Sequence, residues 1–249
     1  SLLDYETLGG YWYLIGAFSV IIMIFTILTA ESIENHGGVN ARAWIWIGGT
    51  SFQPSELVKI LFIITYAKHL DLMSKKGLFR SPFHMLLLAV HAIMPVLLCH
   101  GQGDDGAGVV FFLIAVFMTL AAGVPVRYFI ILGVVIGVSA PLLWRFVLSP
   151  YQKVRFTAVL NLDDPIVAAE GGYQQIQGRT SIGNGQFSGV GLGESVRIPQ
   201  KVVSFQESDF IFSVAGEELG FLGCMAIILL LLFLLIKTLL VARRSRDDM

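Results

Sequence analysis

YWYLIGAFSVIIMIFTILTA, residues 11–30, contains no charged side chain. A helix rises about 1.5 Å per residue, so about 20 apolar residues cross a hydrocarbon layer about 30 Å thick. This stretch therefore predicts a transmembrane helix. The composition of the whole chain supports a membrane protein. Of its residues, 55% are hydrophobic and 14% are charged, whereas soluble domains have about 25% charged residues. We expect an integral membrane protein.

Further apolar stretches follow the first one along the chain. Four of them have the length and composition of a membrane span, namely residues 85–100, 107–124, 128–144 and 221–236. A sixth stretch, residues 57–67, is short and contains Lys59, so it is the weakest of the six. The predicted fold class is an all-α polytopic membrane protein.

Several functional classes do not fit this composition. The net charge of -1 includes no clustered basic excess, which argues against nucleic-acid binding. Cys99 and Cys224 lie inside apolar runs, so they suggest neither a disulfide framework nor a thiolate metal site. The five histidines lack HExxH spacing, which makes a zinc hydrolase a poor interpretation.

Basic residues in short loops predict the orientation of the chain, because they favour the cytoplasmic side. They fall on one side if the spans alternate: Lys68, Lys75, Lys76, Arg80, Arg127, Arg243, Arg244 and Arg246. We expect one transmembrane domain over residues 1–249, with residues 148–208 forming a long extracytoplasmic loop. The chain begins and ends close to a span, so we also expect it to be the middle portion of a longer protein.

Charged residues at membrane depth are costly and are candidates for function. In SFQPSELVKI, Glu56 and Lys59 are three residues apart on one helix face. They form either a structural ion pair or a site at which Lys59 receives a phosphate. In GEELG, Glu217 and Glu218 stand between glycines that suit close helix packing, and a proton relay is the alternative.

The long loop carries acidic and basic residues in equal number, and its glycine-rich stretch SIGNGQFSGVGLGES lacks the GK[ST] of a phosphate loop. The loop also has no histidine and no GxSxG, which excludes the usual serine-hydrolase arrangement. Carboxylates and guanidinium groups remain, and they suit sugar transfer from a diphosphate. Asp164, in LDDP, belongs either to such a site or to a turn. Asp209 either starts a helix after Ser208 or points into a cavity beneath the loop.

Four motifs occur in a recognisable order: WIWIGGTSFQPSELVKI (44–60), GQGDDGA (101–107), GGYQQIQGRTSIGNGQFSGVGLGES (171–195) and SDFIFSVAGEELGFLG (208–223). Together they resemble the SEDS family of bacterial wall polymerases. The resemblance implies a fold of about ten spans, of which this chain holds about six. It also implies a glycosyltransferase that polymerises lipid II outside the cytoplasmic membrane, in cell elongation, division or sporulation, with a class B penicillin-binding transpeptidase as partner.

The resemblance also implies roles for individual residues. Asp209, in ESDFIF, matches the essential aspartate, and Asp164 with Pro165 matches a weaker acidic element. Matches to positions expected to bind substrate are Trp44, Glu56, Lys59, Asp104 and Gln174. The chain departs from the family where Ala43 replaces an arginine, with Arg42 one step earlier, and where Glu207 and Ser208 replace a histidine and a threonine.

The expected reaction is an inverting transfer. Asp209 would take the proton from the acceptor's sugar 4-hydroxyl, which attacks the anomeric carbon of the donor and expels polyprenyl diphosphate. Lys59, Arg155 or a divalent cation would stabilise that diphosphate. Two alternatives stay open: a transporter that flips lipid II, with Glu56, Lys59, His91, Glu217 and Glu218 along its path, and a scaffold that only recruits the transpeptidase.

Overall fold

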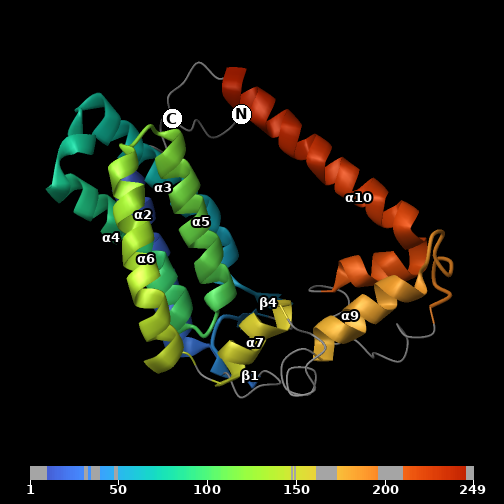
Figure 1. Cartoon of the computed structure of the whole chain (residues 1–249). Helices are drawn as coiled ribbons and strands as arrows, with labels where there is room; N and C mark the ends of the chain where they lie inside the picture. Colours follow the sequence, from blue (N-terminus) through green and yellow to red (C-terminus); the bar gives the residue numbers. More distant parts are fainter. Residues whose placement is uncertain are drawn as a thin grey trace. The chain divides into compact units, whose positions relative to one another are not determined.

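The computed structural model describes residues 10–30, 33–34, 40–47, 50–146, 148, 150–160, 173–195 and 210–244. The chain forms two compact units, Ser1–Val138 with Asp248–Met249 and Ser139–Asp247 (Figure 1). The boundary falls within helix α6 (Val126–Phe146). Each of the six expected spans lies in a helix, and the prediction of an all-α polytopic membrane protein is confirmed.

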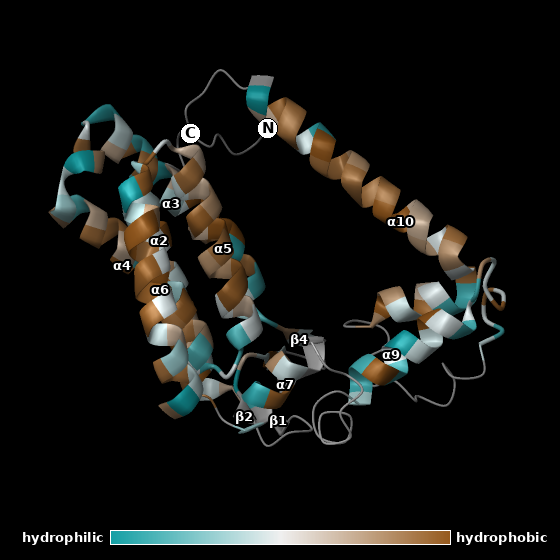
Figure 2. Ribbon diagram, viewed as in Figure 1, coloured by the Kyte–Doolittle hydropathy of each residue, from teal (hydrophilic) through white to brown (hydrophobic). Residues whose placement is uncertain are grey.

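The first unit contains α2 (Trp12–Thr29), α3 (Pro54–Lys75), α4 (Pro82–Gly101) and α5 (Asp105–Ala121). A short 3-10 helix, η1 (Leu78–Arg80), joins α3 to α4. Among the described residues, four helices are long and apolar enough to cross a membrane: α2, α4, α6 and α10 (Ile211–Arg244). Most of α10 and much of α6 have the brown, hydrophobic colour in Figure 2.

Helix α3 is longer than the apolar stretch 57–67, which was the span that the sequence predicted. It begins at Pro54, whose missing amide hydrogen costs nothing at the first helical position, and it continues to Lys75. Asp71 lies in this continuation and is 4% exposed. Its carboxylate contacts the ammonium groups of Lys75 at 2.8 Å and Lys68 at 3.4 Å. These ion pairs allow a polar sequence to extend the helix beyond its apolar part.

Two small hairpins, which the sequence did not predict, follow α2. Strand β1 (Ile33–Glu34) pairs with β2 (Asn40–Ala41), and β3 (Ile45–Ile47) pairs with β4 (Thr50–Phe52), both antiparallel. In the second hairpin Ile45 lies opposite Phe52. Aromatic and β-branched residues favour strands, which accounts for a hairpin in IWIGGTSF.

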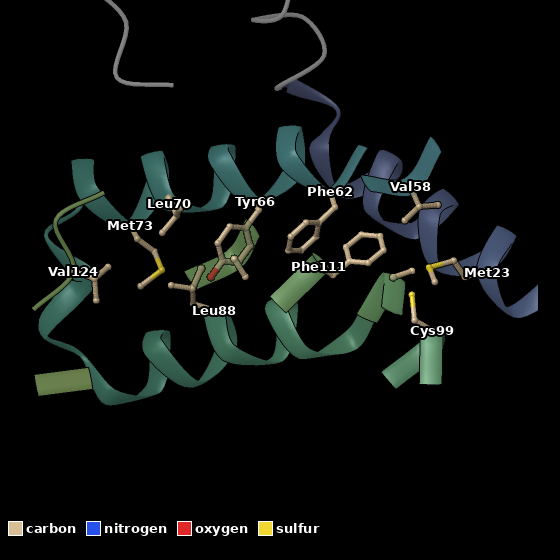
Figure 3. Close-up of a cluster of buried hydrophobic side chains, with 12 residues drawn as sticks. Met23, Val58, Phe62, Tyr66, Leu70, Met73, Leu88, Cys99, Phe111 and Val124 are labelled. Atoms are coloured by element: carbon tan, nitrogen blue, oxygen red, sulfur yellow. The ribbon is translucent and has the colours of Figure 1, made fainter. Parts of the chain in front are cut away.

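The core of the first unit is a row of side chains between α2, α3, α4 and α5 (Figure 3). Phe62 of α3 stacks on Tyr66 at 5.1 Å between ring centroids and meets Phe111 of α5 edge-on at 5.4 Å. Met23 and Cys99 fill one end of the row, and both are buried. The four helices therefore form one packed bundle.

The second unit contains α7 (Pro150–Leu160), α9 (Tyr173–Asn184) and α10. Helix α9 packs along the first part of α10. At Gly220 the backbone leaves the helical conformation, with φ of 65°, and α10 bends sharply (Figure 1). The expected span 221–236 lies in the apolar part after this bend.

Candidate functional site

Polar side chains gather at the end of the first unit where α3 and α5 begin and α4 ends. Asp104 caps α5, since its Oδ1 accepts a hydrogen bond of 3.0 Å from the amide of Ala107. Its other oxygen, Oδ2, accepts a hydrogen bond of 2.6 Å from the side-chain amide of Gln53, the residue before α3. One carboxylate therefore fixes two helix starts.

Gln102 ties two further segments to this end of the bundle. Its side chain is 1% exposed, and its Nε2 donates a hydrogen bond of 3.1 Å to the carbonyl of Met23 in α2. Its own carbonyl accepts a hydrogen bond of 2.8 Å from the amide of Arg42. Gln102 Oε1 and Ser55 Oγ are buried without a hydrogen-bond partner among the described residues. A buried oxygen of this kind is commonly bonded to an ordered water.

Glu56 and Lys59 make the ion pair that their spacing predicts. Their charged atoms are 2.7 Å apart, and the Glu56 side chain is 57% exposed whereas that of Lys59 is 22% exposed. An ammonium group has three donors, so a phosphate can be bound by Lys59 without the loss of Glu56. The structural and the phosphate-binding interpretations are thus compatible.

Trp44 and Arg42 lie on the segment that leads into β3, and both side chains are exposed. Trp46 of β3 is exposed as well. Indole rings combine an apolar body with one hydrogen-bond donor, and they are enriched at membrane surfaces. The segment therefore presents groups that suit an amphiphilic ligand.

The first unit thus holds five of the predicted site residues at one end of its bundle. The Gln53–Asp104 bond connects Asp104 to the helix that carries Glu56 and Lys59, and the Arg42–Gln102 bond connects the segment of Arg42 and Trp44 to the end of α4. Gln53 and Gln102 were not predicted as site residues. The sequence signal was available, because both glutamines stand within the quoted motifs.

The remaining predicted residues belong to the second unit or lie outside the described residues. Gln174 is half-buried in the first turn of α9. Arg155 is on α7, with its side chain outside the described residues, as are Asp164 and Asp209 as a whole. Asp209 directly precedes Phe210, whose carbonyl accepts hydrogen bonds from Ser213 and Val214 in the first turn of α10. The catalytic roles of Asp209 and Asp164 stay predictions.

A divalent cation was the one cofactor considered. Within the described part of the chain, no group of three or more histidine, cysteine, aspartate or glutamate side chains is placed to hold a metal ion.

Apolar helices of spanning length, together with a polar cluster at one end of a helical bundle, define a multi-pass membrane protein. The chain belongs to the cell cycle protein family of FtsW, RodA and SpoVE, whose family model matches residues 2–249.

Named relatives cover nearly the whole chain. A probable peptidoglycan glycosyltransferase FtsW from Geobacter sulfurreducens is 35% identical, over 98% of this chain and 63% of the relative. Stage V sporulation protein E from Bacillus subtilis is 32% identical, over 98% of this chain and 64% of the relative. Peptidoglycan glycosyltransferase MrdB from Escherichia coli K12 is 28% identical, over 90% of this chain and 60% of the relative.

A solved structure has the same fold. A chain from a peptidoglycan synthase complex superposes with a TM-score of 0.71 at 23% identity, over 94% of this chain and 62% of that chain. The chain thus spans about 63% of the length of the FtsW relative.

Proposed function

We propose that the full-length protein is a peptidoglycan glycosyltransferase that polymerises lipid II into glycan strands. The observation that carries the proposal is the family match over residues 2–249, together with relatives named as peptidoglycan glycosyltransferases. The polar end of the first unit adds support, because it combines a cation, carboxylates and exposed indole rings. The active site faces outward from the bacterial inner membrane, on the side opposite the basic loops.

In this proposal Asp209 is the general base of the transfer. It accepts the proton of the acceptor's 4-hydroxyl while that oxygen bonds to the anomeric carbon of the donor, and the bond from that carbon to the diphosphate breaks. Lys59 and Arg155 stabilise the negative charge that develops on the departing diphosphate. Arg42, Trp44, Glu56, Asp104 and Gln174 bind the substrate, and Asp164 shapes the acidic part of the site.

A class B penicillin-binding transpeptidase is the proposed partner. The support is the structural similarity to a chain from a peptidoglycan synthase complex. Crosslinking by the partner would act on the strand that this protein polymerises, so the two activities belong on the same side of the membrane.

The test uses the full-length protein in liposomes that contain lipid II. Wild-type protein is expected to form glycan strands, and Asp209→Ala is expected to form none while it unfolds at the wild-type temperature. Asp163→Asn is the matched control, because it removes another carboxylate of the expected loop 148–208. Polymerisation by Asp209→Ala would overturn the assignment of the base.

One observation favours lipid translocation as a second candidate. A mostly apolar cavity of about 630 Å³ lies between α2, α3 and α4, and Trp12, His69 and His91 are among the residues that line it. The Nδ1 atoms of the two histidines are 3.1 Å apart, and the Trp12 ring stacks on His69. Paired histidines that line a cavity of a membrane protein are candidates for a transport path. Movement of labelled lipid II across liposomes, abolished by His91→Leu, would support this function.

A further inference from the structure

The cavity between α2, α3 and α4 is long and mostly apolar. Its lining follows α2 from Trp12 to Met23 and α3 from Val58 to His69, which is about 16 Å along each helix. This length is about half the thickness of a hydrocarbon layer of about 30 Å, so it suits a lipid chain from one leaflet. The volume of about 630 Å³ is within the range of about 300 to 1,000 Å³ that small-molecule sites occupy.

The two ends of the cavity differ in polarity. Trp12 stacks on His69, so the first lining residue of α2 and the last of α3 share one end. Met23 and Val58 lie at the other end (Figure 3), where both are buried in the hydrophobic core. The cavity therefore has a nitrogen-containing end and an apolar end, as the site of an amphiphile requires.

The cavity opens toward the surrounding lipid between α2 and α4. Four of its lining residues are exposed and lie on these two helices, namely Tyr13, Ile21, Leu87 and Val90. A hydrocarbon chain can thus enter from the side of the bundle, without passing through water.

The polar end of the cavity is on the side that we expect to face the cytoplasm. His69 lies beyond the apolar stretch 57–67 of α3, and Asp71 follows it with its ion pair to Lys75. These charges and the basic loop after α3 mark a membrane surface. A lipid chain of the cytoplasmic leaflet would thus have its head near His69.

The hydrogen bonds around His91 assign the tautomers of both histidines. Thr65 has one hydroxyl hydrogen, which it donates to the carbonyl of Phe62 at 3.1 Å. Its oxygen therefore accepts from His91 Nε2 at 3.4 Å, and His91 Nδ1 is left as an acceptor. His69 Nδ1, which is 3.1 Å away, donates to that acceptor. A neutral His69 consequently has its lone pair on Nε2.

His69 Nε2 is thus an acceptor that needs a donor. Among the described residues, the His69 ring is hydrogen-bonded through Nδ1 to His91. The ring centroids of Trp12 and His91 are 5.7 and 5.4 Å from that of His69, and both rings stack on it. These contacts hold the ring in place. A fixed acceptor at the end of an apolar cavity suits a ligand with one apolar chain and a head that donates a hydrogen bond.

A carboxylic acid meets this requirement in both of its protonation states. The neutral acid donates its O–H to His69 Nε2. If the proton moves from the carboxyl oxygen to Nε2, the carboxylate accepts it back as a hydrogen bond from the imidazolium, and such charge-assisted bonds are about twice as strong as neutral ones. His69 keeps its Nδ1–H in either state, so its bond to His91 persists. An ester has no hydrogen to donate, and an alcohol forms only the neutral bond.

We propose that this cavity binds a long-chain carboxylic acid from the cytoplasmic leaflet, with its carboxyl group on His69 Nε2 and its chain directed toward Met23. The inference goes beyond the proposed function, because binding of the acid requires no glycosyl transfer. The head of this ligand also lies at the opposite end of α3 from Glu56 and Lys59, which we assign to the glycosyl-transfer site.

The experiment uses the full-length protein in nanodiscs that contain palmitic acid with a photoreactive diazirine near the end of its chain. Irradiation is expected to label α2 or α4 at the cavity, which mass spectrometry of the peptides locates. Unlabelled palmitic acid and its methyl ester then compete with the probe. We expect the ester to compete at least about tenfold more weakly than the acid, since it cannot donate to His69. This comparison needs no variant.

Three variants separate the head of the ligand from its chain. His69→Leu is expected to lower the affinity for the acid about tenfold and to leave that for the ester unchanged. Gly16→Phe is expected to abolish labelling, because Gly16 lines the cavity and a methyl group there meets no atom within 4 Å, so a larger ring fills the space. His84→Leu is the matched control, since His84 lies on α4 outside the cavity lining and bonds Ser81.

The unfolding temperature of each variant is measured beside its binding. Equal competition by the acid and the ester in wild type would overturn the inference, as would wild-type affinity for the acid in His69→Leu. Labelling that maps away from the cavity, or that persists in a folded Gly16→Phe variant, would overturn it as well. Loss of binding in His84→Leu would likewise contradict it, because that change leaves the cavity intact.

Discussion

The side-chain amide of Gln53 donates a 2.6 Å hydrogen bond to Asp104, which joins the start of α3 to the start of α5 across 51 residues of sequence. Asp104 also caps α5 through the Ala107 amide. This carboxylate therefore belongs to the architecture of the polar end as well as to the proposed substrate site.

Removal of either partner of this bond should lower stability. We expect Asp104→Ala to cost about 1 to 2 kcal/mol because it removes the helix cap, and Gln53→Ala to cost about 1 kcal/mol. In the double variant the two effects should not add, since they share one bond. Chemical unfolding in detergent measures all three. Fully additive losses would show that the bond contributes nothing.

Variants of the Glu56–Lys59 pair can distinguish a structural ion pair from a role of Lys59 in binding diphosphate. Its charges are partly exposed, so Glu56→Ala should change stability by less than about 1 kcal/mol. Exchange of the two residues, Glu56→Lys with Lys59→Glu, should restore the ion pair but not polymerisation if Lys59 binds diphosphate. Recovery of wild-type polymerisation in the exchanged variant would contradict that role.

Asp71 should make the free energy of unfolding depend on pH. It lies in α3 beyond the expected span 57–67, and its hydrogen bond from Lys75 holds the pKa of its carboxyl below the ordinary 3.8. Its stabilising effect is therefore complete above pH 3.8 and is lost as the pH falls through the lower folded-state pKa. Asp71→Asn should cost about 2 kcal/mol at pH 7.

The measurement for Asp71 is the unfolding temperature of wild type and Asp71→Asn over an acid series. The difference between the two proteins should shrink only below pH 3.8. A difference that already disappears near pH 6 would contradict the assignment to Asp71.

Two alanine substitutions in the glycine-rich stretch 183–189 should change stability in opposite directions. Gly189→Ala places a methyl group on the carbonyl of Glu218 at positive φ, so it should destabilise by more than about 1 kcal/mol. Gly183→Ala, in α9, meets no atom within 4 Å and should stabilise by about 0.5 kcal/mol. Thermal unfolding of the two variants side by side checks this. Equal effects would argue against the close contact between Gly189 and Glu218.

Residues 11–30, 85–100, 128–144 and 221–236 are continuous apolar runs, and each lies in a helix that is long and apolar enough to cross a membrane. The predicted span 11–30 corresponds to α2 (Trp12–Thr29), and the predicted span 107–124 corresponds to α5 (Asp105–Ala121). The span predicted for α3 was too short, because the ion pairs of Asp71 let the helix continue through polar sequence. The hairpin at residues 45–52 was missed because a strand of three residues has no measurable alternation.

The candidate site was predicted in part. Motif positions identified Glu56, Lys59 and Asp104, and Arg42 precedes the first motif. The structure collects these residues at one end of a bundle. The partners of these residues were not predictable, since the Gln53–Asp104 bond depends on how α3 and α5 pack. The contact between the glycine-rich turn after α9 and α10 was missed for the same reason. Four backbone hydrogen bonds join residues 186–191 to residues 217–222, and neither stretch alone indicates the other.

The most direct test of the central claim measures polymerisation and lipid translocation in the same lipid II liposomes, with wild-type full-length protein and Asp209→Asn. This variant keeps the size of the side chain but removes its basicity. We predict glycan strands from wild type and none from Asp209→Asn, with equal translocation in both. Strand formation by Asp209→Asn at the wild-type rate would contradict the account.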